Sequence, residues 1–529
     1  MNTHHYEADQ QQAPSPSSSC TLTFEVLPTA ESERRRLGRW FKRADFQPTG
    51  LFAHTSIDLT VVTPEPGEAG ITLQLIVGTH GFQGKSATEV ESPRTYSLKP
   101  GANVIQDPLG GVMWFRAVSD ETDGLPRQVT VEFTPTNSSL RPLPVYRHGI
   151  TTHLEWLMQL LAWAPTYPVQ LISDRIVITA WCSTAMDNLA QDPALLLDEY
   201  AYILDRENEM AAIGTEPGQT PDSPLRILVS EKVGGNPNAS HYRISLPRYG
   251  REFMTVEGLR RSWGVWHELG HMQHQIAWSA NALTENSVNI FSLAVQRSMR
   301  QPSRAVPYDA SAHAFLNSPA PDFGKVSNMV AMVMWEQLRT AFGHAFFHRL
   351  HQETRANGNS DSGQGDAQYR HYFMVTSCKA ARADLTRFFT RWGWHPQART
   401  LEEIESLGLP APAPDPSTLH IQDATYISQA TRDAGSIVIV GTAQRGSRLK
   451  TTNDPGKGWY DPEAGKVFAN ADTGAFTLRT QRSINGQAAV KSYDPQTGVA
   501  ISESNHMPIE VSMEAFDDEL CHCLEHGDQ

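Results

Sequence analysis

The run His267-Glu268-Leu269-Gly270-His271 constrains this 529-residue chain more than any other stretch of its sequence. On a helix the two histidines lie one turn apart, about 6 Å along the axis, so both imidazoles can point at one ion. Glu268 is poorly placed to be a third ligand, but well placed to take a proton from a metal-bound water. A chain with 20 histidines can contain this pattern by chance, so the flanking sequence has to support it.

That support comes from the residues on both sides. Residues 258–275 have the pattern of a buried amphipathic helix, and a second helical run, 285–300, follows with Thr284 as its N-cap. Glu285 would project from the first turn of this second helix as the third ligand. Two histidines and one glutamate leave the fourth position to water, which is the catalytic type of zinc site. His274 competes as third ligand, but one straight helix cannot easily arrange three imidazoles around a tetrahedral ion, so we favour Glu285.

These residues resemble a known family, the family-60 zinc metallopeptidases, which comprise the enhancin-like and mucin-targeting peptidases. The resemblance begins with residues 266–271, Gln275, Glu285 and residues 288–293. It continues, in the same order along the chain, with residues 45–51, 100–105, 110–115, 164–165, 175–179, 384–389 and 392–394. The resemblance therefore covers about residues 35–396.

The resemblance implies a gluzincin-type zinc endopeptidase, with His267, His271 and Glu285 as metal ligands and Glu268 as the catalytic glutamate. It further implies hydrolysis of secreted glycoproteins, in particular O-glycosylated mucin-type substrates with glycan contact, by Glu-assisted attack of zinc-bound water. Two alternatives remain open. The chain could be a zinc protease effector acting on unglycosylated host proteins, or a glycan-binding protein on a degenerate peptidase scaffold.

Zinc peptidases commonly need a tyrosine or histidine that donates a hydrogen bond to the oxyanion formed when water attacks the carbonyl. The candidates for this role, or for residues that contact and orient the metal ligands, are His274, Asn289, Tyr369, His371 and Tyr372.

The fold class expected for the chain is multidomain α+β: an N-terminal β-sandwich, a mainly helical zincin domain of gluzincin type, and a small C-terminal β domain. The expected boundaries are a disordered N-terminus at 1–20, the sandwich at 21–138, the metallopeptidase domain at 139–402, a Pro-rich linker at 403–419, a β-rich accessory domain at 420–515 and an acidic tail at 516–529. The sandwich is predicted from short alternating strands separated by Gly and Pro, and the linker from the proline repeats of GLPAPAPDPS at 408–417.

Three local predictions concern the surroundings of the motif. Residues 30–44 are expected to form a charged helical entry. Residues 330–350 are expected to form one long helix with an apolar stripe. Residues 241–247 are the candidate for the edge strand that a zincin uses to hold its substrate backbone.

The composition argues against some classes of binding partner and some structural classes. A formal charge of −14 argues against a general nucleic-acid binder, and five scattered cysteines provide no disulfide framework. The sequence contains no apolar run long enough to span a bilayer and no recognisable secretory signal. The family resemblance implies an extracellular protein, so we expect export by a route without a recognisable signal peptide, with an effector acting inside a cell as the alternative.

Overall fold

The structure is a computed structural model. It describes residues 19–511 except for 54–56, 65–69, 84–92, 121–126, 136–139, 165, 215–217, 251, 282, 300, 302, 358–364, 422–424, 434–435, 444–445, 452–466, 470–474, 481–486, 494, 496–499 and 505–506. The predicted disordered N-terminus before residue 19 and the acidic tail at 516–529 lie outside the described residues.

The chain forms two compact units that are not continuous in sequence. Unit 1 contains residues 1–205 and 222–273, and unit 2 contains residues 206–221 and 274–529. The short segment 206–221 therefore belongs with residues that come much later in the chain. Arg355 of unit 2, for example, donates hydrogen bonds to the carbonyl oxygens of Ala211 and Ala212, at 2.8 and 3.1 Å.

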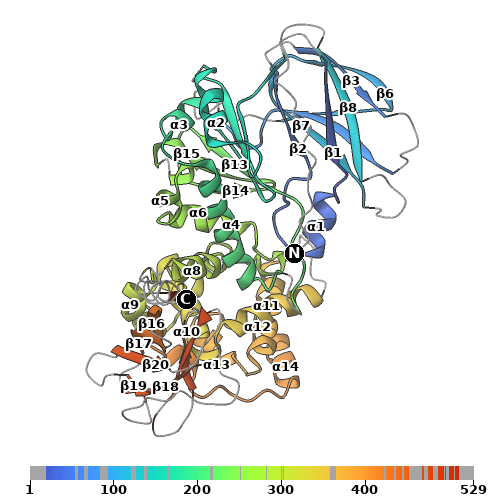
Figure 1. Cartoon of the computed structure of the whole chain (residues 1–529). Helices are drawn as coiled ribbons and strands as arrows, with labels where there is room; N and C mark the ends of the chain where they lie inside the picture. Colours follow the sequence, from blue (N-terminus) through green and yellow to red (C-terminus); the bar gives the residue numbers. More distant parts are fainter. Residues whose placement is uncertain are drawn as a thin grey trace, which may run out of the picture. The chain divides into compact units, whose positions relative to one another are not determined.

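The N-terminal part of unit 1 consists of two antiparallel sheets, drawn in blue and cyan in Figure 1. One sheet has the order β1-β8-β3-β6, and the other β5-β4-β7-β2-β9. One hydrophobic core includes side chains from both sheets, among them Phe24, Val131, Leu75 and Phe115. The predicted strand-rich N-terminal domain is thereby confirmed. The strands are β1 (Cys20–Glu25), β2 (Gln47–Ala53), β3 (Ile57–Thr63), β4 (Thr72–Val77), β5 (Arg94–Ser97), β6 (Gly101–Asp107), β7 (Gly111–Val118), β8 (Gln128–Pro135) and β9 (Leu140–Pro142).

Helix α1 (Ala30–Arg36) is shorter than the helical entry predicted for 30–44. Thr29 caps its start by accepting a hydrogen bond from the backbone N–H of Ser32. Gly38, with a φ of 64°, takes a left-handed conformation just beyond the helix, which turns the chain out of its helical path.

The rest of unit 1 is built around a six-stranded mixed sheet with the order β10-β11-β12-β13-β15-β14. Its strands are β10 (Val145–Arg147), β11 (Pro168–Ile172), β12 (Ile176–Trp181), β13 (Ile227–Lys232), β14 (Asn238–Ser240) and β15 (Arg243–Pro247). Its helices are α2 (His153–Leu161), α3 (Cys182–Met186), α4 (Pro193–Met210, whose last residues enter unit 2), α5 (Val256–Leu259) and α6 (Trp263–His271). The strand pairs β12–β13 and β13–β15 are parallel, whereas β14 pairs antiparallel with β15 at the end of the sheet.

Unit 2 begins with a helical part that confirms the predicted helical middle region of the chain. Its helices are α7 (Thr284–Ser287), α8 (Asn289–Ser298), α9 (Asp309–Leu316), α10 (Asn328–Phe342), α11 (His344–Ala356), α12 (Asp366–Ala381), α13 (Thr386–Arg391) and α14 (Ala398–Ser406). The single long helix predicted for 330–350 is wrong. Gly343 separates α10 from α11 because its φ of 71° lies in the left-handed region, which a helix cannot continue through.

The described residues after α14 are mostly strands, as expected for a C-terminal β domain. One sheet has the order β20-β17-β16-β25 and another β19-β18-β22-β23, and a hydrophobic core lies among them. The strands are β16 (Tyr426–Asp433), β17 (Ser436–Thr442), β18 (Arg448–Thr451), β19 (Val467–Phe468), β20 (Ala475–Thr480), β21 (Gln487–Ala488), β22 (Val490–Tyr493), β23 (Ala500–Glu503), β24 (Met507–Pro508) and β25 (Glu510–Val511). Within the described part of the chain, no helix is long and apolar enough to cross a membrane.

Candidate metal centre

Helix α6 carries the HExxH residues and is shorter than the helix predicted for 258–275. Ser262 caps its start by accepting from the backbone N–H of Val265, and the helix ends at His271. The indole Nε1 of Trp266 donates to the carbonyl oxygen of Leu259 at 2.8 Å, which joins α6 to α5 across the break between them. The sequence pattern therefore predicted the helix that carries the motif, but with different bounds. The first residues of the predicted helix belong to α5, and its last residues lie beyond the end of α6.

The two motif histidines have a mutual geometry suited to one ion. Their ring centroids lie 4.8 Å apart and the ring planes are perpendicular. Two imidazoles bound to one tetrahedral zinc have centroids about 5 Å apart, given Zn–N bonds of about 2.1 Å. His271 is buried, whereas His267 is partly exposed. The pair therefore fits a metal ion without rearrangement of the helix.

Glu268, between the two histidines, is buried, with 7% of its surface exposed. Two cations of the neighbouring sheet are within electrostatic reach of it. Burial lowers the pKa of Lys232 at the end of β13, and Arg243 lowers it further, while the charge of Glu268 acts in the opposite direction. Burial likewise lowers the pKa of Arg243 on β15, again opposed by Glu268. No sequence motif pointed to Lys232 or Arg243, because their proximity to Glu268 depends on the sheet.

The segment after α1 lies against the end of α6. Phe41 makes an edge contact with the ring of His271, with centroids 6.3 Å apart, and another with His241 at 5.6 Å. Arg39, which is 2% exposed, donates through Nη2 to Oε1 of the buried Gln273 at 2.7 Å. No sequence pattern indicated these contacts, since the partners are at least 200 residues apart.

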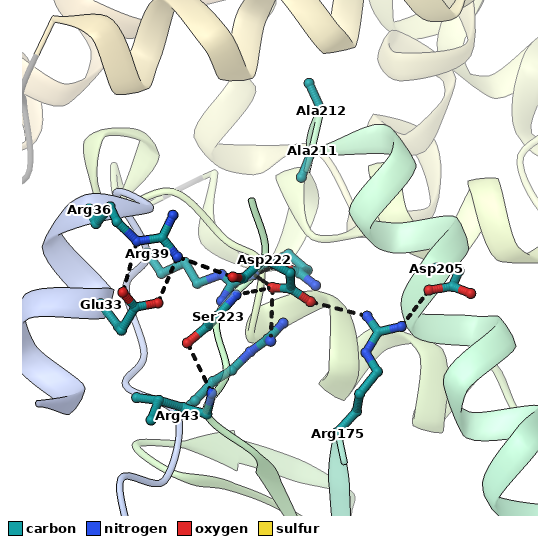
Figure 2. A network of polar contacts seen from close by, with 12 residues as sticks. Glu33, Arg36, Arg39, Arg43, Arg175, Asp205, Ala211, Ala212, Asp222 and Ser223 are labelled. Atoms are coloured by element: carbon teal, nitrogen blue, oxygen red, sulfur yellow. Dashed lines mark hydrogen bonds and ion pairs between the residues drawn. The ribbon is translucent and has the colours of Figure 1, made fainter. Parts of the chain in front are cut away.

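An arginine cluster fixes this segment. Arg39, Arg43 and Arg175 all donate to the carboxylate of Asp222, at 3.1, 3.0 and 3.2 Å, and Figure 2 shows the three guanidinium groups converging on it. Arg175 also pairs with Asp205 at the end of the first stretch of unit 1. The cluster therefore holds the 39–43 segment against β12 and the chain around Asp222.

The edge of the six-stranded sheet nearest to α6 is β14, not the predicted 241–247 stretch. That stretch contains β15, which is paired on both sides, with β13 and with β14. Helix α6 contacts β14, and a Cβ on Gly264 would meet the ring of Pro237 at 3.2 Å. The other side of β14 has no strand partner in the described part of the sheet.

Glu285 lies in the first turn of α7, a single helical turn followed by α8. Thr284, predicted as the N-cap, is instead the first helical residue, and Leu283 occupies the cap position. Three contacts within unit 2 hold this turn: His274 Nε2 with Ser287 Oγ at 2.7 Å, Asn289 Nδ2 with the Glu285 carbonyl oxygen at 3.0 Å, and Trp335 Nε1 with the Asn286 carbonyl oxygen at 2.8 Å. His274 and Asn289 are thus bonded to the turn that carries Glu285.

The ligand set predicted from the sequence consists of His267 and His271, both on α6, and Glu285 on α7, and this set stays a prediction. Two imidazole nitrogens and one carboxylate oxygen are a donor set that zinc accepts in hydrolytic enzymes. Such a set leaves a coordination position for water or substrate.

The remaining predicted candidates lie on α12. His371 contacts α14 through Thr400 Oγ1 at 3.0 Å and Glu403 at 3.1 Å. Tyr372 donates its hydroxyl to the Thr354 carbonyl oxygen of α11 at 3.3 Å. Tyr369 is partly exposed. Their role as oxyanion donors stays a prediction.

Comparison with known families decides the classification. Residues 140–393 match the description "Peptidase M60, enhancin and enhancin-like", and residues 28–132 match the "N-terminal domain of M60-like peptidases". The chain belongs to the M60 peptidase family. Membership confirms the resemblance drawn from the sequence, and the family of metallopeptidases implies a metal cofactor.

Two relatives of this M60 chain are animal proteins. It is 25% identical over 284 residues to TRPM8 channel-associated factor 2 of Homo sapiens. The aligned region covers 50% of this chain and 29% of the relative. It is 26% identical over 399 residues to TRPM8 channel-associated factor 3 of Rattus norvegicus, covering 70% and 39%. The chain thus spans well under half the length of these relatives.

Solved structures of bacterial proteins share the fold. A functionally unknown conserved protein from Bacillus anthracis has a TM-score of 0.65 at 22% identity, covering 93% of this chain and 100% of that one. The ZmpB metallopeptidase from Clostridium perfringens gives 0.64 at 17% identity, with 92% and 100% covered. The M60 catalytic domain of ZmpC from the same organism, in complex with the sialyl T antigen, gives 0.61 at 18%, with 93% and 100% covered.

Proposed function

We propose that the chain is a zinc-dependent endopeptidase of the gluzincin type, in which His267, His271 and Glu285 bind zinc. The observation that carries this proposal is the perpendicular pair of imidazoles on α6, 4.8 Å apart, with a buried carboxylate between them in sequence. When bound, zinc would supply Lewis-acid polarisation of the scissile carbonyl and would acidify the attacking water. M60 membership supports the assignment.

Glu268 is the residue that moves the proton. It accepts a proton as water attacks the carbonyl carbon, and returns it to the amine nitrogen when the C–N bond breaks. A carboxylate that is 7% exposed suits this role because water cannot compete freely for the proton. Lys232 and Arg243 set the electrostatic environment in which Glu268 works.

The substrate backbone would pair with β14. An extended peptide can add to a sheet edge through main-chain hydrogen bonds, and β14 is the edge strand that contacts α6. Because β14 is only three residues long, the pairing would be short and side-chain or glycan contacts would contribute the rest of the specificity.

We propose secreted, O-glycosylated proteins of the mucin type as substrates, met outside the cell. The complex of the ZmpC M60 domain with the sialyl T antigen supports glycan contact in this fold. The alternative is an effector that cleaves unglycosylated proteins within a host cell.

One assay tests both the catalytic mechanism and the proposed substrate class. An O-glycosylated mucin fragment, before and after enzymatic deglycosylation, is incubated with the zinc-loaded wild type, with Glu268→Gln, and with Glu257→Gln as a matched control on the exposed face of α5. Wild type and control are expected to cut only the glycosylated form, and Glu268→Gln is expected to bind zinc without cutting. Cleavage by Glu268→Gln would overturn the mechanism. Equal cleavage of both forms would overturn glycan dependence alone.

A second candidate is a binding protein without peptidase activity. The names of the animal relatives, TRPM8 channel-associated factors, favour it because they describe an association and not a hydrolysis. Zinc content decides between the two: a chain that binds no zinc under conditions where it is folded would be a degenerate peptidase scaffold.

A further inference from the structure

A second group of histidine and carboxylate side chains lies in unit 2, apart from the HExxH helix in sequence. Asp309 and His313 are separated by one turn of α9, and His420 follows the 3₁₀ turn Pro416–Thr418, shortly before β16. One ligand atom from each lies within 4.8 Å of the others. The proposed peptidase mechanism does not use it.

The contacts inside this group are close and directed at one carboxylate. Asp309 is 1% exposed. Its Oδ2 lies 2.7 Å from His420 Nδ1, its Oδ1 lies 3.8 Å from His313 Nε2, and Oδ1 also accepts from the backbone N–H of Ile421 at 2.9 Å. The carboxylate thus has a donor or a potential metal ligand facing each of its oxygens.

We propose that Asp309, His313 and His420 form a second zinc site. Ligand atoms around a tetrahedral zinc lie about 3.4 Å apart, given bonds of about 2.1 Å. The separations of 2.7 and 3.8 Å from the two Asp309 oxygens lie on either side of that value. Shifts of less than about 1 Å would bring them to it. One carboxylate and two neutral imidazoles are typical zinc ligands, and they leave a fourth position for water.

Zinc binding requires one rearrangement. The rings of His313 and His420 are stacked, with centroids 3.7 Å apart and planes inclined by 22°. Two zinc-bound imidazoles need about 5 Å between centroids. His420 can supply the difference by turning outward because its side chain is 49% exposed, whereas His313 is held in α9.

Two further groups, the Leu419 carbonyl oxygen and the Arg391 guanidinium, affect zinc binding at this site. His313 Nε2 lies 3.1 Å from the carbonyl oxygen of Leu419, a contact that zinc would replace. The positive charge of Arg391 acts on His313 and opposes a second cation there. The ion would join α9 to the segment that leads into the C-terminal strands.

Zinc stoichiometry tests the proposal, with the full chain dialysed against a competing chelator of micromolar affinity. His313→Gln and His420→Asn keep an amide N–H near the original ring nitrogen, so the hydrogen bonds are retained while the imidazole ligand is lost. His395→Gln is the matched control, because His395 is an exposed histidine bonded to the Pro321 carbonyl oxygen. The wild type and the control are expected to retain about two zinc ions and each of the two site variants about one.

A second set of variants, made in the His271→Ala protein, distinguishes the two zinc sites. In His271→Ala, which removes a ligand of the proposed catalytic site, about one zinc ion should remain, and His420→Asn added to it should remove that ion. A wild type with one ion that His271→Ala abolishes would overturn the second site and leave the peptidase proposal intact. Two ions retained in both site variants would also overturn it. In that case the group is a hydrogen-bonded link and not a metal site.

Discussion

Glu336 is the best place to test how the helical core of unit 2 is held together. Its carboxylate accepts hydrogen bonds from Arg297 Nη1 on α8, at 2.6 Å, and from Arg339 Nε on α10, at 2.9 Å. All three side chains are at most 6% exposed. The neighbouring Trp335 bonds the turn that carries Glu285, so α10 supports both α7 and α8.

Replacing Glu336 by Gln leaves two buried guanidinium groups without the charge that compensates them. Removal of one partner from a buried ion pair costs about 3–5 kcal/mol. Gln retains one acceptor oxygen but turns an N–H group toward an arginine, so we expect a loss of about 3 kcal/mol in the free energy of local opening. The control is Glu402→Gln on the exposed face of α14, which should change stability by less than about 0.5 kcal/mol.

Hydrogen exchange of peptides from α8 and α10, followed by mass spectrometry, is the suitable assay because a chain with two units need not unfold in one step. The pH dependence gives a second check. Burial alone would raise the pKa of Glu336, but the charges of Arg339 and Arg297 and their hydrogen bonds outweigh it, and the pKa lies below its usual value of 4.5. The stabilisation is therefore present above about pH 4.5 and is lost as pH falls through the lower folded-state pKa.

The difference between wild type and Glu336→Gln should accordingly be largest near neutral pH and shrink in acid. A difference below about 1 kcal/mol at pH 7 would refute the reasoning, because it would mean that the arginines are compensated as well by other groups. A difference that stays constant down to about pH 3 would contradict the assigned pKa direction.

Three further predictions concern other parts of the chain. Burial, and secondarily the charge of Arg355, lower the pKa of His351 to about 3, so protonation of the unfolded chain should destabilise α11 as pH falls from about 6.5, and His351→Phe should flatten this slope in hydrogen exchange. Arg39→Met removes the bond to Gln273 and should weaken zinc binding about 10-fold in a chelator competition without loss of the folded state. Asp107→Asn weakens the ion pair with Arg94 and should destabilise the N-terminal sandwich by about 1–3 kcal/mol in urea unfolding.

The sequence could predict elements whose signal is local. The HExxH helix, the strand-rich N-terminal part and the strands after α14 all follow from periodicity within short windows. Local signals also explain the errors. An apolar stripe that continues through Gly343 predicted one helix where there are two, since the left-handed conformation of a single glycine does not alter the periodicity around it.

The surroundings of the motif could not be predicted, because they depend on contacts between distant segments. Nothing in the 39–43 segment indicates that Arg39 bonds Gln273, 234 residues later. The position of β14 at the edge depends on the strand order of a mixed sheet, and the strand next to it, β15, has the more regular pattern. Some residues support a site from a different helix or strand. Their separation from the site along the chain follows no fixed spacing, so no sequence pattern detects them.

The discontinuous make-up of unit 2 has a consequence for biosynthesis. Ala211 receives its hydrogen bond from Arg355, which is synthesised 144 residues later. At about 5–20 residues per second, a ribosome needs roughly 7–29 s to cover that distance. During this interval the 206–221 segment has left the ribosome before its partner in unit 2 exists. Folding of unit 2 is therefore delayed until most of the chain has emerged, and nascent chains arrested in this interval are the ones that we expect chaperones and proteases to recognise.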